Sequence, residues 1–175
     1  MKKITILLGL VMVVGIASLS LAGNPDSINL MVTPVSNVSV NIVDGSYNFG
    51  IVDLYNGTTV STELQVENDG SVQASWAHKA GDATAGASTW DLVYAGTAAS
   101  TDEFRLWAEI ADTKPGSFPE TRKVTSGDTI LTGGSNIPFA TTKKLWIQLE
   151  MPYGVTGADG NLEHTSVYTI TATAD

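Results

Sequence analysis

The feature that most constrains the fold of this chain is an alternation of apolar and polar residues that continues through most of its length. In residues 103–110 and 144–151, for example, nearly every second residue belongs to one apolar set. An alternation with period 2 is typical of a β-strand that buries one face, and no stretch of 11 or more residues carries a persuasive helical stripe. The sequence therefore predicts an all-β protein.

Turn-forming residues divide the alternating segments into about eight to ten short strands. Strands at this spacing are typical of two antiparallel sheets packed face to face, and a closed barrel is the alternative architecture. The main strands are expected at residues 28–43, 47–54, 59–67, 72–76, 89–95, 103–110, 144–151 and 165–173, with shorter ones at residues 122–125 and 129–131.

Gly, Asn and Asp mark several connections between these strands. Residues 68–71 read Asn-Asp-Gly-Ser and predict a tight hairpin turn, because these residue types tolerate the positive φ that such turns require. Residues 80–88 are rich in Gly, Ala and Thr and predict a loop. Residues 112–142 and 152–163 are expected to be long loop insertions, which are common carriers of binding on a rigid sandwich.

The first residues have the pattern of a secretory signal. Two lysines precede an apolar run over residues 4–21, and Ser20 and Ala22 are small residues at the −3 and −1 positions of a cleavage site. A retained membrane anchor is the alternative, because about 17 to 25 apolar residues can span a bilayer. We expect cleavage after Ala22, which leaves residues 23–175 as a single domain of a bacterial protein. Since no cysteine follows Ala22, a lipid-attached form is excluded.

Charge and cysteine content narrow the classes of partner and chemistry. Removal of the two N-terminal lysines leaves seven basic against 18 acidic residues, a formal net charge of −11. Such a field repels phosphate backbones and anionic lipids, so we expect no nucleic-acid partner and no membrane association after signal removal. The chain has no cysteine, which excludes disulfides, thiol nucleophiles and zinc–thiolate sites.

One stretch near the start of the domain carries a family resemblance. Residues 47–52 read Tyr-Asn-Phe-Gly-Ile-Val, Gly57 follows, and an alternating strand over residues 60–66 leads into Glu-Asn-Asp-Gly-Ser at residues 67–71. This pattern resembles bacterial immunoglobulin-like surface modules of the choice-of-anchor and hydin type. The resemblance implies an immunoglobulin-like sandwich and extracellular placement. It implies no catalytic residues, and the long insertions depart from those modules.

The tryptophans are the most informative side chains for ligand binding. Trp76 falls on the same face of its expected strand as the apolar neighbours and is expected in the core. Trp107 and Trp146 alternate against the apolar residues of their strands, so an outward position is one interpretation, in which they stack on sugar rings or anchor a protein interface. The other is that a loop covers them or that both faces of their strands are buried. The apolar sets are Phe104, Leu106, Ala108 and Ile110, and Leu145, Ile147, Leu149 and Met151.

The segment at residues 28–43 has two interpretations. A regular alternating strand just behind the mature terminus can insert into the sheet of a neighbouring subunit and so build a polymer. It can equally pair within its own sandwich, which is an ordinary way to hold a terminal segment. The residues of this candidate assembly strand are Ile28, Leu30, Val32, Val38, Val40 and Ile42.

Catalytic and metal-binding patterns are weak. His78 and His164 have no recognisable ligand spacing, both are expected at the surface near strand ends, and no Gly-x-Ser-x-Gly elbow is present. Residues 158–163 are the nearest approach to a calcium loop, but they lack further Asp or Asn ligands, and a plain hairpin turn at Asp159-Gly160 is favoured. We expect no catalytic residues, no metal and no cofactor.

Together these features predict a non-enzymatic structural or interaction protein that is extracellular, at the cell surface or in the periplasm. Self-association into a filament or surface layer, through strand or edge contacts, is the leading hypothesis, and another envelope protein is the other expected partner. The alternative is a carbohydrate-binding module that uses Trp107 and Trp146 on a polysaccharide. A secreted hydrolase with a histidine base is the third class.

Overall fold

The computed structural model describes residues 31–96 and 98–175, and this part of the chain confirms the all-β prediction. The chain divides into two compact units, Met1–Pro34 and Val35–Asp175. In the first unit the described residues form no secondary structure, and Met31 and Val32 are exposed. No helix of the described residues is long and apolar enough to cross a bilayer.

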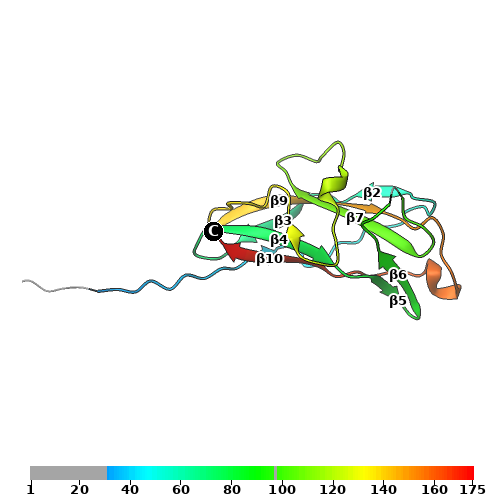
Figure 1. Cartoon of the computed structure of the whole chain (residues 1–175), viewed down its shortest axis with the longest axis horizontal. Helices are drawn as coiled ribbons and strands as arrows, with labels where there is room; N and C mark the ends of the chain where they lie inside the picture. Colours follow the sequence, from blue (N-terminus) through cyan, green and yellow to red (C-terminus); the bar gives the residue numbers. More distant parts are fainter. Residues whose placement is uncertain (1–30, 97) are drawn as a thin grey trace, which may run out of the picture. The chain divides into compact units, whose positions relative to one another are not determined.

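Among the described residues, the larger sheet of the second unit has seven strands in the order β1-β3-β9-β7-β6-β5, with β2 also paired to β9. Figure 1 labels all of these strands except β1. Among the described strands, β6 and β7 alone pair in parallel. β9 is central, because it pairs with β7 along one edge and with β2 and β3 along the other. The bounds are β1 (Asn41–Ile42), β2 (Thr58–Val60), β3 (Leu64–Asn68), β5 (Ala83–Ala85), β6 (Ser88–Leu92), β7 (Glu103–Ile110) and β9 (Thr141–Glu150).

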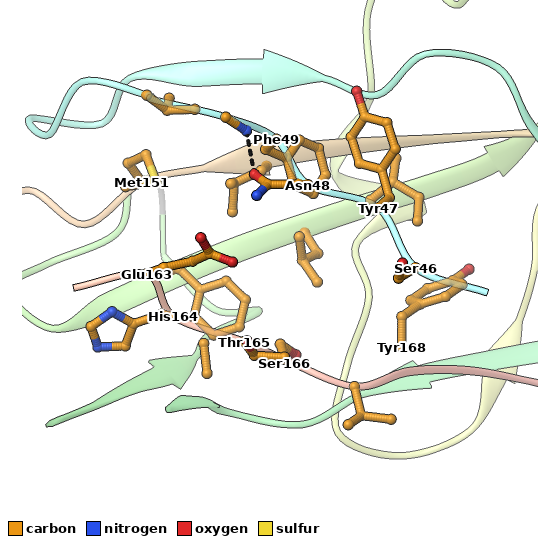
Figure 2. A pocket seen from close by; sticks show the side chains of 18 of the residues that line it. Ser46, Tyr47, Asn48, Phe49, Met151, Glu163, His164, Thr165, Ser166 and Tyr168 are labelled. Atoms are coloured by element: carbon orange, nitrogen blue, oxygen red, sulfur yellow. Dashed lines mark hydrogen bonds between the residues drawn. The ribbon is translucent and has the colours of Figure 1, made fainter. Parts of the chain in front are cut away.

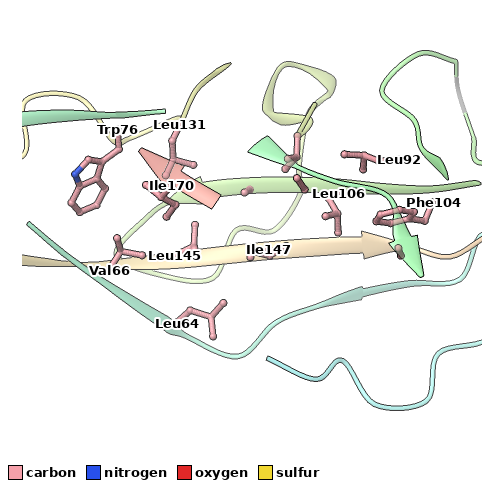
Figure 3. Packing of buried hydrophobic residues seen from close by; sticks show 14 of the residues in the cluster. Leu64, Val66, Trp76, Leu92, Phe104, Leu106, Leu131, Leu145, Ile147 and Ile170 are labelled. Atoms are coloured by element: carbon pink, nitrogen blue, oxygen red, sulfur yellow. The ribbon is translucent and has the colours of Figure 1, made fainter. Parts of the chain in front are cut away.

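The smaller sheet has three strands in the order β10-β4-β8 and consists of β4 (Ala74–Ala80), β8 (Thr129–Ile130) and β10 (Tyr168–Ala174). The core lies between the two sheets, where Trp76 and Ile170 of the small sheet face Val66 and Leu145 of the large one (Figure 3). Two open sheets make a β-sandwich, so the closed-barrel alternative is wrong. Three strands cover less area than seven. Part of the inner face of the large sheet is therefore covered by segments without regular secondary structure.

A β-bulge separates β2 from β3. Val60 is opposite Gln148 and Leu64 is opposite Leu145, so four residue steps on one strand match three on the other. The backbone of Ser61 fills the gap, because its amide donates to the Ile147 carbonyl at 2.8 Å. One extra residue moves all the following side chains of a strand to the opposite face of the sheet. The alternating strand expected over residues 60–66 is therefore interrupted, and Val60 does not share the face of Leu64.

The Asn-Asp-Gly-Ser turn at residues 68–71 connects the two sheets rather than two paired strands. β3 belongs to the large sheet and β4 to the small one, so the hairpin prediction is wrong. Asn68 is fully buried, and its Nδ2 donates to the carbonyls of Val72 (3.0 Å) and Ile137 (2.9 Å). This side chain replaces the ladder bonds that a hairpin would make and holds the crossing between the sheets.

Other strand boundaries differ from the prediction because contacts between distant segments determine them. Residues 80–88, expected as a loop, contain β5 and the start of β6, which form a hairpin. Residues 47–54 form no strand, and the η1 3₁₀ helix (Glu120–Arg122) takes part of the short strand expected at residues 122–125. The expected strand at residues 103–110 is confirmed as β7, because its alternation is long and uninterrupted.

Candidate functional site

Trp107 and Trp146 are both buried, with exposed fractions of 3% and 8%. They lie on the face of the large sheet that points away from the core, as their parity predicts, but connecting segments cover that face. Trp107 forms an isolated bridge with Lys123, and the Trp146 Nε1 donates to the Ala111 carbonyl at 3.0 Å. The outward-facing interpretation is therefore wrong, and the interpretation that both faces of these strands are buried is confirmed. Neither indole presents a ring face to a sugar.

A buried ion pair holds one of these covering segments. Arg105 and Glu150 are opposite each other on β7 and β9, form a salt bridge, and are 3% and 5% exposed. The Glu150 Oε1 accepts a hydrogen bond from the Ala99 amide at 2.9 Å, and the Arg105 Nη1 donates to the Gly96 carbonyl at 3.2 Å. The pair fastens the segment between β6 and β7 to the outer face of the sheet.

A second group of charges fastens the long connection between β7 and β8. Lys123 forms a salt bridge with Glu120, and its Nζ donates to the Gly96 carbonyl at 3.1 Å. Arg122 forms a salt bridge with Glu109, which is buried on β7. The Lys123 Nζ also lies 5.7 Å from the centre of the Trp107 ring, a cation–π arrangement. These contacts hold the connection between β7 and β8 against the outer face of the sheet.

His78 lies inside the sandwich, so the prediction of a surface position for it is wrong. It is 2% exposed on β4, and its Nδ1 lies 2.9 Å from the hydroxyl of Tyr168. Burial lowers the pKa of His78 from 6.5 to about 4 and raises the pKa of Tyr168 far above its ordinary value. A neutral imidazole paired with a tyrosine between two strands is a structural contact.

Acid is expected to destabilise the fold through His78. Because its folded pKa of about 4 is below the ordinary 6.5, the unfolded chain binds the proton first, and stability falls as the pH drops from about 6.5 to about 4. The loss is on the order of 2–3 kcal/mol and levels off below pH 4. Urea unfolding at a series of pH values measures it. His78→Gln should flatten this slope and His164→Gln should keep it, whereas equal slopes in His78→Gln and the wild type would contradict the assignment.

His164 is half-buried beside β6. Its ring stacks on Trp90 with centres 3.7 Å apart, and its Nε2 lies 3.1 Å from the Ser88 hydroxyl. The candidate calcium loop contains the η2 3₁₀ helix (Ala158–Asn161) in place of the expected hairpin turn. The Asp159 carboxylate there accepts a hydrogen bond from the Ala87 amide at 3.1 Å. Among the described residues, no three His, Asp or Glu side chains gather to hold a metal ion.

The candidate assembly strand is only partly visible. Ile28 and Leu30 lie outside the described residues. Val32 and Val38 are exposed, and the described residues before Asn41 form no strand. Val40 and Ile42 pack against the core, and β1 pairs with β3. The last residues of this segment therefore belong to their own sandwich, as one of the two interpretations predicts.

A groove of about 800 Å³ opens where the small sheet fails to cover the large one (Figure 2). Residues 44–52 form its first wall, and residues 162–168, which lead into β10, form its second wall. The floor is the inner face of the large sheet and is almost wholly apolar. The floor residues include Trp90, Phe104, Leu106, Ile147, Leu149 and Met151.

The second wall is a backbone segment that pairs along one side before it enters β10. Thr165 and Thr84 exchange two backbone hydrogen bonds of 3.0 Å, and the Val167 carbonyl accepts from the Gly81 amide at 3.1 Å. Since successive backbone groups alternate sides along a strand, those of His164 and Ser166 point away from these partners, on the side of the groove. Within residues 31–96 and 98–175 these groups have no hydrogen-bond partner. The unpaired side continues along β10, which pairs with β4 alone among the described strands.

The first wall is held in place by side chains rather than by a ladder. The Tyr47 hydroxyl accepts a hydrogen bond from the Thr62 amide at 3.0 Å, and the Tyr47 and Phe49 rings meet edge to face at 4.9 Å. The Asn48 Oδ1 accepts from the Gly50 amide at 2.7 Å (Figure 2). In the described part of the chain, the backbone amides of Tyr47, Phe49 and Ile51 have no acceptor. Both walls thus contain backbone groups that have no partner among the described residues.

Sequence reasoning did not find this groove, because an unpaired edge is a property of three-dimensional neighbours. The one available signal was the strand expected at residues 47–54, whose alternation is real but whose backbone has no strand to pair with. Comparison with known proteins adds no assignment: no protein-family model matches the chain, and no curated protein matches it significantly.

Proposed function

We propose that this protein is an exported, non-enzymatic structural subunit of the bacterial cell surface, built on an immunoglobulin-like sandwich, that assembles into a filament or surface layer through strand contacts. The observation that carries the proposal is the apolar groove with an unpaired strand edge in its wall. An exposed edge of this kind is a template for pairing with another chain, and soluble monomers normally cover or blunt it.

Features of the chain outside the groove support the same role. The secretory pattern of residues 1–22 supports a position beyond the cytoplasm. The most deeply buried of the described ionisable residues on the outer face hold loops in place. They are Arg105, Glu109, Lys123 and Glu150. The carbohydrate-binding alternative requires exposed Trp107 and Trp146, and both side chains are buried.

Sedimentation velocity and electron microscopy of residues 23–175, over a range of protein concentrations, test the proposal. Ordered polymers should appear as the concentration rises, and calcium should make no difference, because the Asp159 carboxylate is already bonded to backbone. A chain that stays monomeric across the whole range would contradict the structural role and direct attention to the groove as a small-molecule site.

A further inference from the structure

The groove lies where one further strand, added beside β10, would extend the small sheet of the sandwich. The small sheet ends at β10, and the wall that leads into β10 offers unpaired backbone groups at His164 and Ser166. We infer that residues 27–34 of a second copy of this chain fill the groove as an added β-strand, with Ile28, Leu30 and Val32 against the apolar floor. This inference rests on the proposed function and specifies its contact.

The segment has the composition that this position requires. Ile28, Leu30 and Val32 alternate with Asn29 and Met31, so one face of an extended segment is wholly apolar. Residues 27–34 carry no charged side chain, so their burial desolvates no charge. Eight extended residues span about 26 Å, which equals the length of the eight-residue edge at residues 163–170.

The unpaired backbone of the walls favours a peptide strand over a small apolar ligand. A lipid or hydrocarbon would bury unpaired backbone groups of the second wall, such as those of Ser166, without hydrogen bonds, and each buried unpaired group costs about 1–3 kcal/mol. An added strand supplies donors and acceptors along its edges as well as apolar side chains for the floor. Main-chain bonds combined with alternate side-chain pockets are how extended peptides bind to sheet edges.

The direction of the chain favours a second copy over the molecule's own segment. Asn37 is bonded to Ser71, at the turn that crosses between the sheets, and from there the chain runs through β1 toward the groove. Within Val35–Asp175, the residues that lead into β1 are therefore bonded at this turn, which does not line the groove. Binding of residues 27–34 in the groove of the next copy is a head-to-tail contact, which generates an open filament when its rotation does not close.

Thiol cross-linking tests the contact, because the chain has no cysteine of its own. We would combine Leu30→Cys with Ser166→Cys in the second wall, and separately with Ser46→Cys in the first wall, and treat each polymer with a short bifunctional thiol reagent. The matched control combines Leu30→Cys with Ser126→Cys, an exposed serine outside the groove. Serine-to-cysteine changes preserve side-chain size.

We expect a ladder of covalent oligomers on a denaturing gel for at least one groove pair, and no ladder beyond dimers for the control. Cross-linked monomers, closed within one chain, would overturn the second copy in favour of self-insertion. Polymers by sedimentation that give no ladder from either wall would overturn the groove contact and leave the proposed assembly intact. If the wild-type chain forms no polymer and neither groove pair cross-links, the inference and the proposed function both fail.

Discussion

Replacing Glu150 with glutamine is expected to lower the free energy of unfolding by about 3–5 kcal/mol, because it leaves the Arg105 guanidinium in a buried position without its carboxylate. Replacing both partners with methionine should restore most of that loss, since the pair is enclosed and two apolar side chains remove the charge that needs compensation. Urea denaturation at neutral pH measures all three chains.

The exposed pair of Lys144 and Glu63 provides the matched control. Its atoms are 2.8 Å apart, but the side chains are 44% and 38% exposed, so Glu63→Gln should change stability by less than about 1 kcal/mol. If the methionine double variant were as unstable as Glu150→Gln, the cost would come from lost packing of the loop at Ala99 and not from an uncompensated charge.

Trp76→Ala should cost about 3–5 kcal/mol of unfolding free energy, because the ring fills the space between the two sheets and is 1% exposed. Its backbone also joins two neighbouring segments, with the amide bonded to Gly134 and the carbonyl to Leu131, so the surrounding structure cannot collapse freely into the cavity. The measurement is again chemical denaturation, with the midpoint and slope fitted separately.

Phe139→Ala is the control for Trp76→Ala, because Phe139 is an aromatic residue that is 63% exposed. It should change stability by about 0.5 kcal/mol or less. A Trp76→Ala variant with wild-type stability would mean that the two sheets do not pack through this side chain, which would contradict the sandwich itself.

The parts of the fold that follow from local alternation could be predicted from the sequence. β7 begins and ends where its pattern begins and ends, and Trp76 is in the core as its parity indicates. The alternation with period 2 is a property of a single strand, so it can be recognised without knowing which strands lie beside it. The same parity correctly placed Trp107 and Trp146 on the face opposite the core residues.

The parts that depend on distant neighbours could not be predicted. Parity says which face a tryptophan is on, but the burial of Trp107 depends on a connection held by Lys123 and on the buried Arg105–Glu150 pair. The turn at residues 68–71 has hairpin chemistry, yet Asn68 bonds to Ile137, 69 residues away, and the chain changes sheets. Which edge stays unpaired is likewise decided by the whole set of strands.

The measurement that tests strand insertion most directly is sedimentation velocity on two double-lysine variants of the same segment. Ile28→Lys with Leu30→Lys places charge on the face that is expected to meet the groove, and Asn29→Lys with Met31→Lys places the same charge on the opposite face. We expect the first variant to remain monomeric at concentrations where the wild type and the second variant polymerise. Equal polymerisation of the two variants would contradict insertion of this segment as a strand.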